Sequence, residues 1–193
     1  MKRMTVVLLV LVSFAAFAQE ENLIGDKIES GGFGAPVWRT TRLCGETAFL
    51  AGGRGGWIIN HTYVIGGGGY STVGDVKTGK TGDLGKPLYL RTEYSGLELE
   101  YIRHSDKVLH WTVHALFGGG SIQVREHEPD IQISSDRIVV LQAGLNAELN
   151  VLRWLRLNAG AGYRAVYGVD AKGFGNGDIG GPELQVTVKF GKF

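Results

Sequence analysis

The chain has 193 residues, and its 20 basic and 19 acidic residues leave a formal charge of only +1. This balance excludes the basic excess expected of a nucleic-acid-binding protein, and a single cysteine excludes an internal disulfide. The length fits one domain, and 31 glycines with only 4 prolines and no repeats argue against a disordered chain.

The N-terminus has the features of a secretory signal peptide. Lys2 and Arg3 precede an apolar run from Thr5 to Phe17, and residues 16–18, Ala-Phe-Ala, place small side chains where signal peptidase cleaves. A membrane anchor is the alternative, but the run is shorter than the roughly 20 residues that a spanning helix needs. We expect a signal peptide at 1–18 with cleavage near Ala18, a polar periplasmic lead-in at 19–31, and one barrel domain at 32–193.

The rest of the chain alternates between apolar and polar residues, the period of two that is typical of β-strands. The clearest example has Val139, Leu141 and Leu145 on one face and Gln142 and Glu148 on the other. No segment shows a convincing helical period. The pattern predicts eight strands, at 33–43, 46–60, 61–73, 88–102, 108–124, 138–149, 155–167 and 182–192.

The strand predicted at 88–102 changes phase along its length. Leu88 and Leu90 lie at even positions, whereas Leu97 and Leu99 lie at odd ones. One extra residue in a strand reverses its alternation, so a β-bulge near Ser95-Gly96 is predicted to restore a single apolar face.

The predicted connections alternate in length. Those at 60–61, 103–107 and 150–154 are short, whereas those at 74–87, 125–137 and 168–181 are longer and polar. Tight periplasmic turns and longer external loops are typical of bacterial outer-membrane barrels, although the first external connection, at Cys44-Gly45, is short. Cys44 is interpreted as a small turn residue, with a reactive thiol as the alternative. The predicted fold is all-β: a single closed antiparallel up-and-down transmembrane β-barrel of about eight strands.

Charges of both signs lie in mid-strand on the polar faces. The interior of an eight-stranded barrel is filled by side chains, so opposite charges can pair there. We therefore expect a polar network in the lumen made of Arg54, Glu98, Glu100, His110, His114, Glu148, Arg156, Arg164 and Lys189.

The apolar faces carry aromatic residues near the strand ends. Phe49 and Trp57 share a face eight residues apart, about 26 Å along a strand, close to the ~25 Å apolar band of a membrane barrel. Tyr70 and Tyr89 are also placed near external loops, although aromatic residues are common in any strand. The expected aromatic girdle consists of Phe49, Trp57, Trp111, Phe117, Tyr163 and Tyr167.

No catalytic, cofactor or metal site is predicted. His110 and His114 lie about 13 Å apart on a strand, too far to share one ion with bonds of ~2.1 Å. His127, with Glu126, Glu128 and Asp130, could bind a cation weakly, but a solvated acidic loop is preferred. Ser121 with the two strand histidines is the loose candidate for a nucleophile and base.

The end of the chain adds a further signal. Its last strand, 182–192, is followed by a terminal aromatic residue, Phe193, which resembles the insertion signal of outer-membrane barrels. The whole pattern resembles the small eight-stranded barrels typified by outer-membrane proteins A and X, and residues 52–61 and 189–193 resemble uncharacterised exported barrels of Bacteroidetes-like bacteria. The resemblance implies a Gram-negative outer-membrane location, contact with membrane lipid, and recognition of the C-terminal strand by the barrel-insertion machinery. It implies no catalytic residues.

Three functions follow as hypotheses. The first is a non-enzymatic integral outer-membrane barrel with a polar, side-chain-filled lumen, acting in envelope structure or in surface interaction through its external loops, with an unidentified extracellular partner. The second is a soluble periplasmic lipocalin-like carrier of an apolar ligand, with Leu145, Leu149 and Leu157 pointing inward. The third is a lipid-modifying outer-membrane enzyme.

Overall fold

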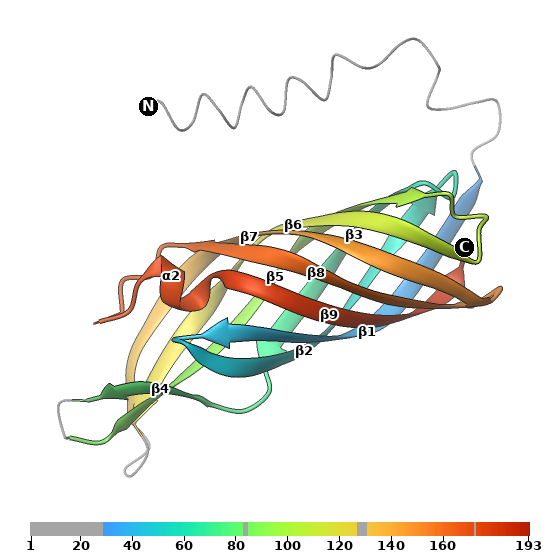
Figure 1. Cartoon of the computed structure of the whole chain (residues 1–193). Coiled ribbons are helices and arrows are strands. Elements are labelled where there is room, and N and C mark those ends of the chain that lie inside the picture. The colour runs from blue at the N-terminus through green and yellow to red at the C-terminus, as the bar shows by residue number, and fades with distance from the viewer. Residues whose placement is uncertain (1–28, 83–84, 127–130, 172) are drawn as a thin grey trace, which may run out of the picture.

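The computed structural model describes residues 29–82, 85–126, 131–171 and 173–193 (Figure 1). The predicted signal peptide at 1–18 and most of the lead-in at 19–31 lie outside the described residues, as do His127, Glu128 and Asp130. In the part of the chain that is described, no helix is both long and apolar enough to cross a membrane.

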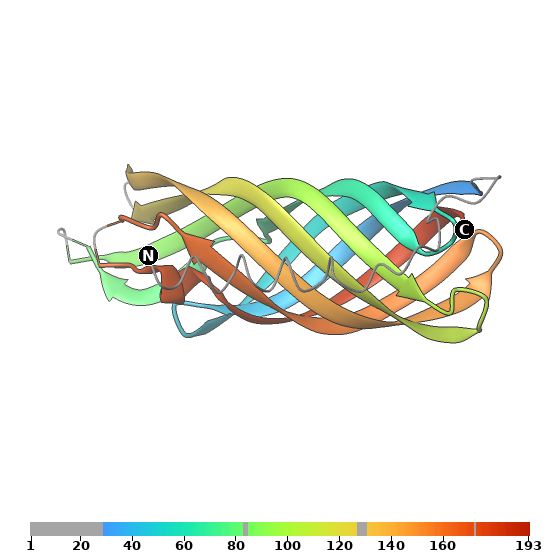
Figure 2. The same ribbon diagram turned by 90° about the horizontal axis from the view of Figure 1, so that it is seen from above.

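Eight long antiparallel strands close into a barrel, which confirms the predicted all-β, closed antiparallel architecture. Each pairs with its neighbour along the chain, and β1 pairs with β9 to complete the ring. The strands wrap obliquely around the barrel (Figure 2). The elements are β1 (Ser30–Leu43), β2 (Glu46–Ile59), β3 (Tyr63–Thr72), β4 (Val76–Thr81), β5 (Pro87–Arg103), β6 (Leu109–Glu126), β7 (Ile131–Leu152), β8 (Leu155–Tyr167), α2 (Asn176–Ile179) and β9 (Gly181–Lys192).

The two ends of the barrel differ. At one end, called the turn end, short connections follow β2, β5 and β7, and the chain enters β1 and leaves β9. The opposite, loop end carries the remaining connections. There the β1–β2 hairpin turns on Cys44 and Gly45, with φ of 53° and 84°. Two positive φ values in a two-residue turn match the twist of the flanking strands.

Two of the predicted external loops contain strand. The segment predicted as a loop at 74–87 includes β4, which pairs with β5 through Val76↔Leu90 and Lys77↔Tyr89. Most of the loop predicted at 125–137 is also strand, because β6 continues to Glu126 and β7 begins at Ile131. These strand ends project at the loop end, beside β4 (Figure 1). These two loop predictions failed because a strand that extends past the apolar part of the outer wall needs no apolar outer face, so its sequence lacks the alternation that marks a strand.

The predicted β-bulge near Ser95-Gly96 is wrong. β5 pairs with β6 without a register shift, from Leu88↔Glu126 to Arg103↔Trp111. Leu88 and Leu90 therefore point into the barrel, whereas Leu97 and Leu99 point outward. The change of phase marks a change in the interior, which is apolar at the loop end.

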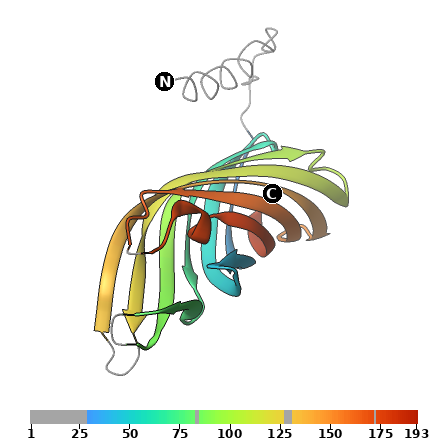
Figure 3. The same ribbon diagram turned by 60° about the vertical axis from the view of Figure 1, so that its left-hand side comes forward.

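The interior has three layers along the barrel. At the loop end, α2 and its flanking chain lie within the rim of strand ends (Figure 3) and bury Phe174 and Ile179 in a large apolar cluster, called the apolar plug. Polar side chains fill the middle. A smaller cluster closes the turn end, where the ring of Phe193 curls inward to stack on Phe33 with centroids 6.3 Å apart.

The outer wall is apolar. The side chain of Leu145 is 59% exposed on β7, whereas Glu148 on the opposite face is fully buried at 0%. Leu149, Leu157 and Val186 also point outward, and Arg164 is buried. The inverted faces that the lipocalin-like hypothesis requires are therefore not the ones observed.

Candidate functional site

The candidate site is the polar middle layer of the lumen. The structure buries every residue of the expected network inside the barrel, contributed by strands β2, β5, β6, β7, β8 and β9: Arg54, Glu98, Glu100, His110, His114, Glu148, Arg156, Arg164 and Lys189. Their inward orientation follows from the alternation of the strands, since the residues next to each of them in sequence are apolar or small and point outward.

Toward the turn end, these residues form a dense ion-pair network, called the turn-side cluster. Arg54 bridges two carboxylates, with Nε 2.5 Å from Glu98 Oε2 and Nη2 2.6 Å from Glu100 Oε2. Lys189 Nζ lies 2.6 Å from Glu100 Oε1 and also contacts Glu148. Buried charges are tolerated when they are paired and hydrogen-bonded in this way.

Glu148 joins further partners to the same cluster. Its Oε1 lies 3.1 Å from Arg156 Nη1 and 3.2 Å from His110 Nε2. Asn158 Nδ2 donates to its Oε2 at 3.2 Å. The cluster therefore contains three basic side chains, on Arg54, Arg156 and Lys189, and three carboxylates, on Glu98, Glu100 and Glu148.

A second group lies nearer the loop end and includes residues that the sequence reasoning missed. Arg39 Nη1 donates to Gln142 Oε1 at 2.6 Å and to Tyr94 Oη at 2.9 Å. Its guanidinium carbon lies 3.6 Å above the ring of Tyr70. Its position in the alternation could have identified Arg39, because it shares the inward phase of Val37 and Thr41 whereas Trp38 points outward.

Tyr70 was predicted to lie with the external aromatics, and this is wrong. Tyr70 occupies an even position of β3 like Val64, so its ring points inward. Its hydroxyl donates to Glu98, an interaction that makes burial of the phenol favourable.

The two strand histidines have separate partners. His110 binds Glu148, whereas His114 contacts Asn146 Nδ2 at 3.1 Å and Gln142 Nε2 at 3.3 Å. Gly144 makes room for the second ring, because a Cβ there would lie 2.4 Å from His114 Cε1. Among the residues that the structure describes, no group of three or more His, Cys, Asp or Glu side chains could hold a metal ion.

The loose candidate for a nucleophile and base is not assembled. Ser121 lies on the outer face of β6, where its Oγ donates to Glu93 Oε1 at 3.2 Å. His110 and His114 lie on the inner face of the same strand. The wall of the barrel thus separates the hydroxyl from both imidazoles.

Glu126, the one residue grouped with His127 that the structure describes, does not lie in a solvated loop. Glu126 ends β6 and is buried, with its Oε1 accepting from the backbone N–H of Lys86 at 3.3 Å.

Burial raises the pKa of the Cys44 thiol to about 11. This thiol is therefore protonated at neutral pH, which supports the interpretation of a turn residue and not of a nucleophile.

Aromatic side chains line the outside at the turn end. Tyr101 packs between Tyr63 and Trp111, with centroid distances of 5.6 and 6.2 Å, and Trp154 stacks on Phe190 at 6.1 Å. The structure places all residues of the expected girdle on the outer face with exposed rings: Phe49, Trp57, Trp111, Phe117, Tyr163 and Tyr167. Their membrane role stays a prediction.

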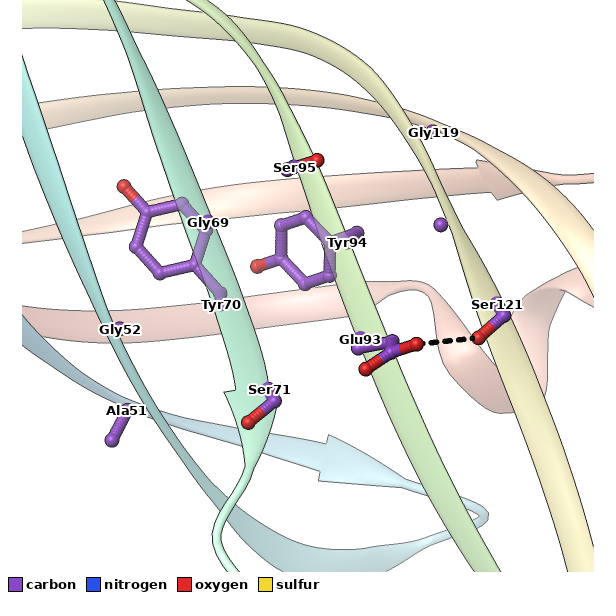
Figure 4. A pocket seen from close by; sticks show the side chains of 11 residues that line it. Ala51, Gly52, Gly69, Tyr70, Ser71, Glu93, Tyr94, Ser95, Gly119 and Ser121 are labelled. Carbon is purple, nitrogen blue, oxygen red and sulfur yellow. Dashed lines mark hydrogen bonds between the residues drawn. The ribbon is translucent and has the colours of Figure 1, made fainter.

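A shallow hollow of about 470 Å³ interrupts the outer wall across β2, β3, β5 and β6 (Figure 4). Gly69 and Gly119 lie in its lining together with Ser95, so the wall there is little thicker than the backbone. The hydrogen bond between Glu93 and Ser121 crosses one side of it (Figure 4). The hollow is therefore a polar gap in an otherwise apolar wall.

No protein-family model and no curated protein matches this chain. Among solved structures, the chain is similar to Neisserial surface protein A, NspA, at 14% identity and a TM-score of 0.59, covering 87% of this chain and 100% of that one. It also matches Ail of Yersinia pestis (11% identity, TM-score 0.46, 84% and 97% covered) and OprG of Pseudomonas aeruginosa (10%, 0.44, 86% and 96%). The likeness to NspA shows the fold, that of a small closed antiparallel β-barrel.

Proposed function

We propose that this chain is a non-enzymatic integral outer-membrane barrel with a sealed lumen, which presents its loop end to the surroundings of the cell. The observation that carries the proposal is the distribution of polarity: a paired charged interior inside an apolar wall. A bilayer requires this arrangement, because lipid cannot satisfy charged groups.

The apolar wall has the height that a membrane needs. On β7, the outward residues from Val139 to Leu149 are apolar over a stretch of about 33 Å along the strand. At the usual strand tilt of 35–45°, this length corresponds to a height of about 25 Å, the thickness of the apolar band. The aromatic residues of the turn end then lie at the inner interface.

Export and orientation complete the proposal. We infer that residues 1–18 direct export and are removed near Ala18, and that the insertion machinery recognises β9. The turn end would face the periplasm and the loop end the exterior, following the short-turn and long-loop asymmetry of such barrels. The projecting ends of β4, β5, β6 and β7 would then form the surface available to a partner outside the cell.

The interior argues against a diffusion pore. Apolar residues of the plug fill the loop end, polar and charged side chains crowd the middle, and Phe193 with its neighbours closes the turn end. Eight strands leave room for little more than side chains. The proposed role is therefore envelope structure or surface contact, and not passive transport.

The test is fractionation of the protein from its native host. We expect it in the outer-membrane fraction, extractable only with detergent, with gel mobility that changes on boiling. Release by osmotic shock, in a form soluble without detergent, would contradict membrane insertion. The non-enzymatic assignment is tested by comparing lipid A from cells with the wild-type protein and from cells with the His110→Ala or His114→Ala variant. A change in lipid A composition would contradict that assignment.

A further inference from the structure

Two buried arginines near the loop end share one carboxylate. Arg39 and Arg164 are only 2% and 1% exposed. Both face Glu183, with Arg39 Nη1 3.8 Å from Oε1 and Arg164 Nη1 3.4 Å from Oε2. The stronger partner of Glu183 is neutral, because Gln142 Nε2 donates to its Oε1 at 2.5 Å. Two positive charges therefore face a single, loosely held negative charge.

The turn-side cluster shows what a balanced arrangement looks like in the same lumen. Its three basic groups match its three carboxylates, and they are in direct contact: Arg54 Nε lies 2.5 Å from Glu98 Oε2, and Arg156 Nη1 lies 3.1 Å from Glu148 Oε1. Glu98 accepts a hydrogen bond from Tyr70, which lies between it and Arg39, and its own ion pair is with Arg54. The turn-side cluster therefore has no spare carboxylate for Arg39 or Arg164.

The other contacts of the two arginines are uncharged. The Tyr94 hydroxyl lies 2.9 Å from Arg39 Nη1 and 3.4 Å from Arg164 Nη1, so one oxygen serves both guanidinium groups. Arg164 Nη2 donates to the backbone carbonyl of Ile179 at 3.0 Å and reaches Thr41 Oγ1 at 3.5 Å. These acceptors satisfy some N–H groups without balancing the charge.

Several donors of the pair have no acceptor. Among the described residues, no hydrogen-bond partner is found for Arg39 Nε, Arg39 Nη2 or Arg164 Nε, although all three atoms are buried. A buried guanidinium is stable only when its charge and its N–H groups are both matched. The pair lacks a negative charge and hydrogen-bond acceptors in the same place.

We infer that Arg39 and Arg164 bind a small inorganic anion, with chloride as the ion that ordinary solutions supply. One monovalent anion beside the two guanidinium groups balances the second positive charge and accepts the free N–H groups. Both guanidinium groups are buried between the apolar plug and the turn-side cluster, which favours a compact ion over a larger organic anion. The ion is enclosed as the barrel closes, so it must be present during folding. This inference does not depend on where the barrel is located.

The direct test is anomalous diffraction with bromide, a heavier substitute for chloride. The barrel is unfolded in urea, refolded into detergent in sodium bromide and crystallised, and data are collected at the bromine absorption edge. We expect an anomalous peak within hydrogen-bonding distance of both guanidinium groups. A map with bromide elsewhere but no peak at the arginine pair overturns the inference.

A second test uses stability and a matched pair of variants. The barrel is refolded in sodium chloride or in sodium gluconate at equal ionic strength, because gluconate is a much larger anion than chloride. We expect the unfolding midpoint to be about 2–4 °C higher in chloride, the shift that modest ligand saturation produces in a protein of this size. Equal midpoints in the two salts overturn the inference.

The variants separate the site from general salt effects. Arg39→Met leaves one arginine for one carboxylate, so the difference between the two salts should disappear. Arg156→Met disturbs the turn-side cluster at Glu148 and leaves the ion pair of Arg54 with Glu98 in place, so it should lower the midpoint in both salts and keep the difference between them. A chloride effect of wild-type size in Arg39→Met would overturn the assignment to this pair.

Discussion

At the scale of single residues, Glu148 is the carboxylate through which the turn-side cluster is joined to β6 and β8. It is completely buried and contacts Lys189, Arg156 and His110. Glu148→Gln keeps the size of the side chain but leaves two buried basic groups short of one negative charge. We expect a loss of about 3–5 kcal/mol in the free energy of unfolding, measured by urea titration of the refolded barrel.

The same chemical change on the outer face provides the control. Glu93 is exposed and its contact with Ser121 is a single hydrogen bond. Glu93→Gln should therefore change the free energy of unfolding by no more than about 0.5 kcal/mol. Similar losses in the two variants would mean that the interior charges are hydrated and not paired.

At the scale of elements, each barrel strand has one face for lipid and one for the lumen. Leu145 lies at the middle of the apolar stretch of β7 and points outward. Leu145→Arg should cost about 2–4 kcal/mol on folding into lipid vesicles, because the charge would lie near the bilayer midplane. Val151→Arg, on the same strand near the turn end, should cost about 0–1 kcal/mol. Equal costs would contradict the proposed membrane position.

The strands also show how far the sequence pattern reaches. Alternation locates all eight barrel strands because one face is held apolar by the outer wall. The same pattern cannot tell an inward leucine from an outward one, so Leu88 and Leu90 were interpreted as a bulge. In the apolar plug, side chains from distant strands pack against α2, and no local sequence pattern predicts such long-range contacts. β4 was missed because its residues are polar and glycine-containing.

The candidate site was predicted to a similar extent. Charged residues on the polar face of clearly alternating strands, such as Glu148 and Arg164, were predicted to lie in the lumen from their position in the alternation alone. Arg39 and Glu183 were not, although both share the inward phase of their strands. Their importance comes from pairing across the lumen between β1, β8 and β9, and a one-dimensional pattern carries no information on which buried charges lack a partner.

At the scale of the whole molecule, the asymmetry of the two ends predicts how the barrel is oriented. Both ends of the barrel sheet, the start of β1 and the end of β9, lie with the short turns at the turn end. A chain that is exported and then inserted from the periplasm leaves these parts behind and carries the long connections across. The loop end, with β4, should therefore be exposed on the cell surface, and the turn end should not.

Cysteine labelling can test this orientation, since Cys44 is the single cysteine of the sequence. In a Cys44→Ser background, Lys77→Cys places a thiol on an exposed position of β4, and Asp106→Cys places one on an exposed position of the β5–β6 turn. On intact cells, a maleimide that cannot cross the outer membrane should label only the first variant. After the cells are lysed, both should react, which shows that both thiols are accessible in the folded barrel. Labelling of the Asp106→Cys variant alone on intact cells would mean that the barrel is inserted in the opposite direction, and labelling of neither variant before lysis would mean that the loop end does not reach the cell surface.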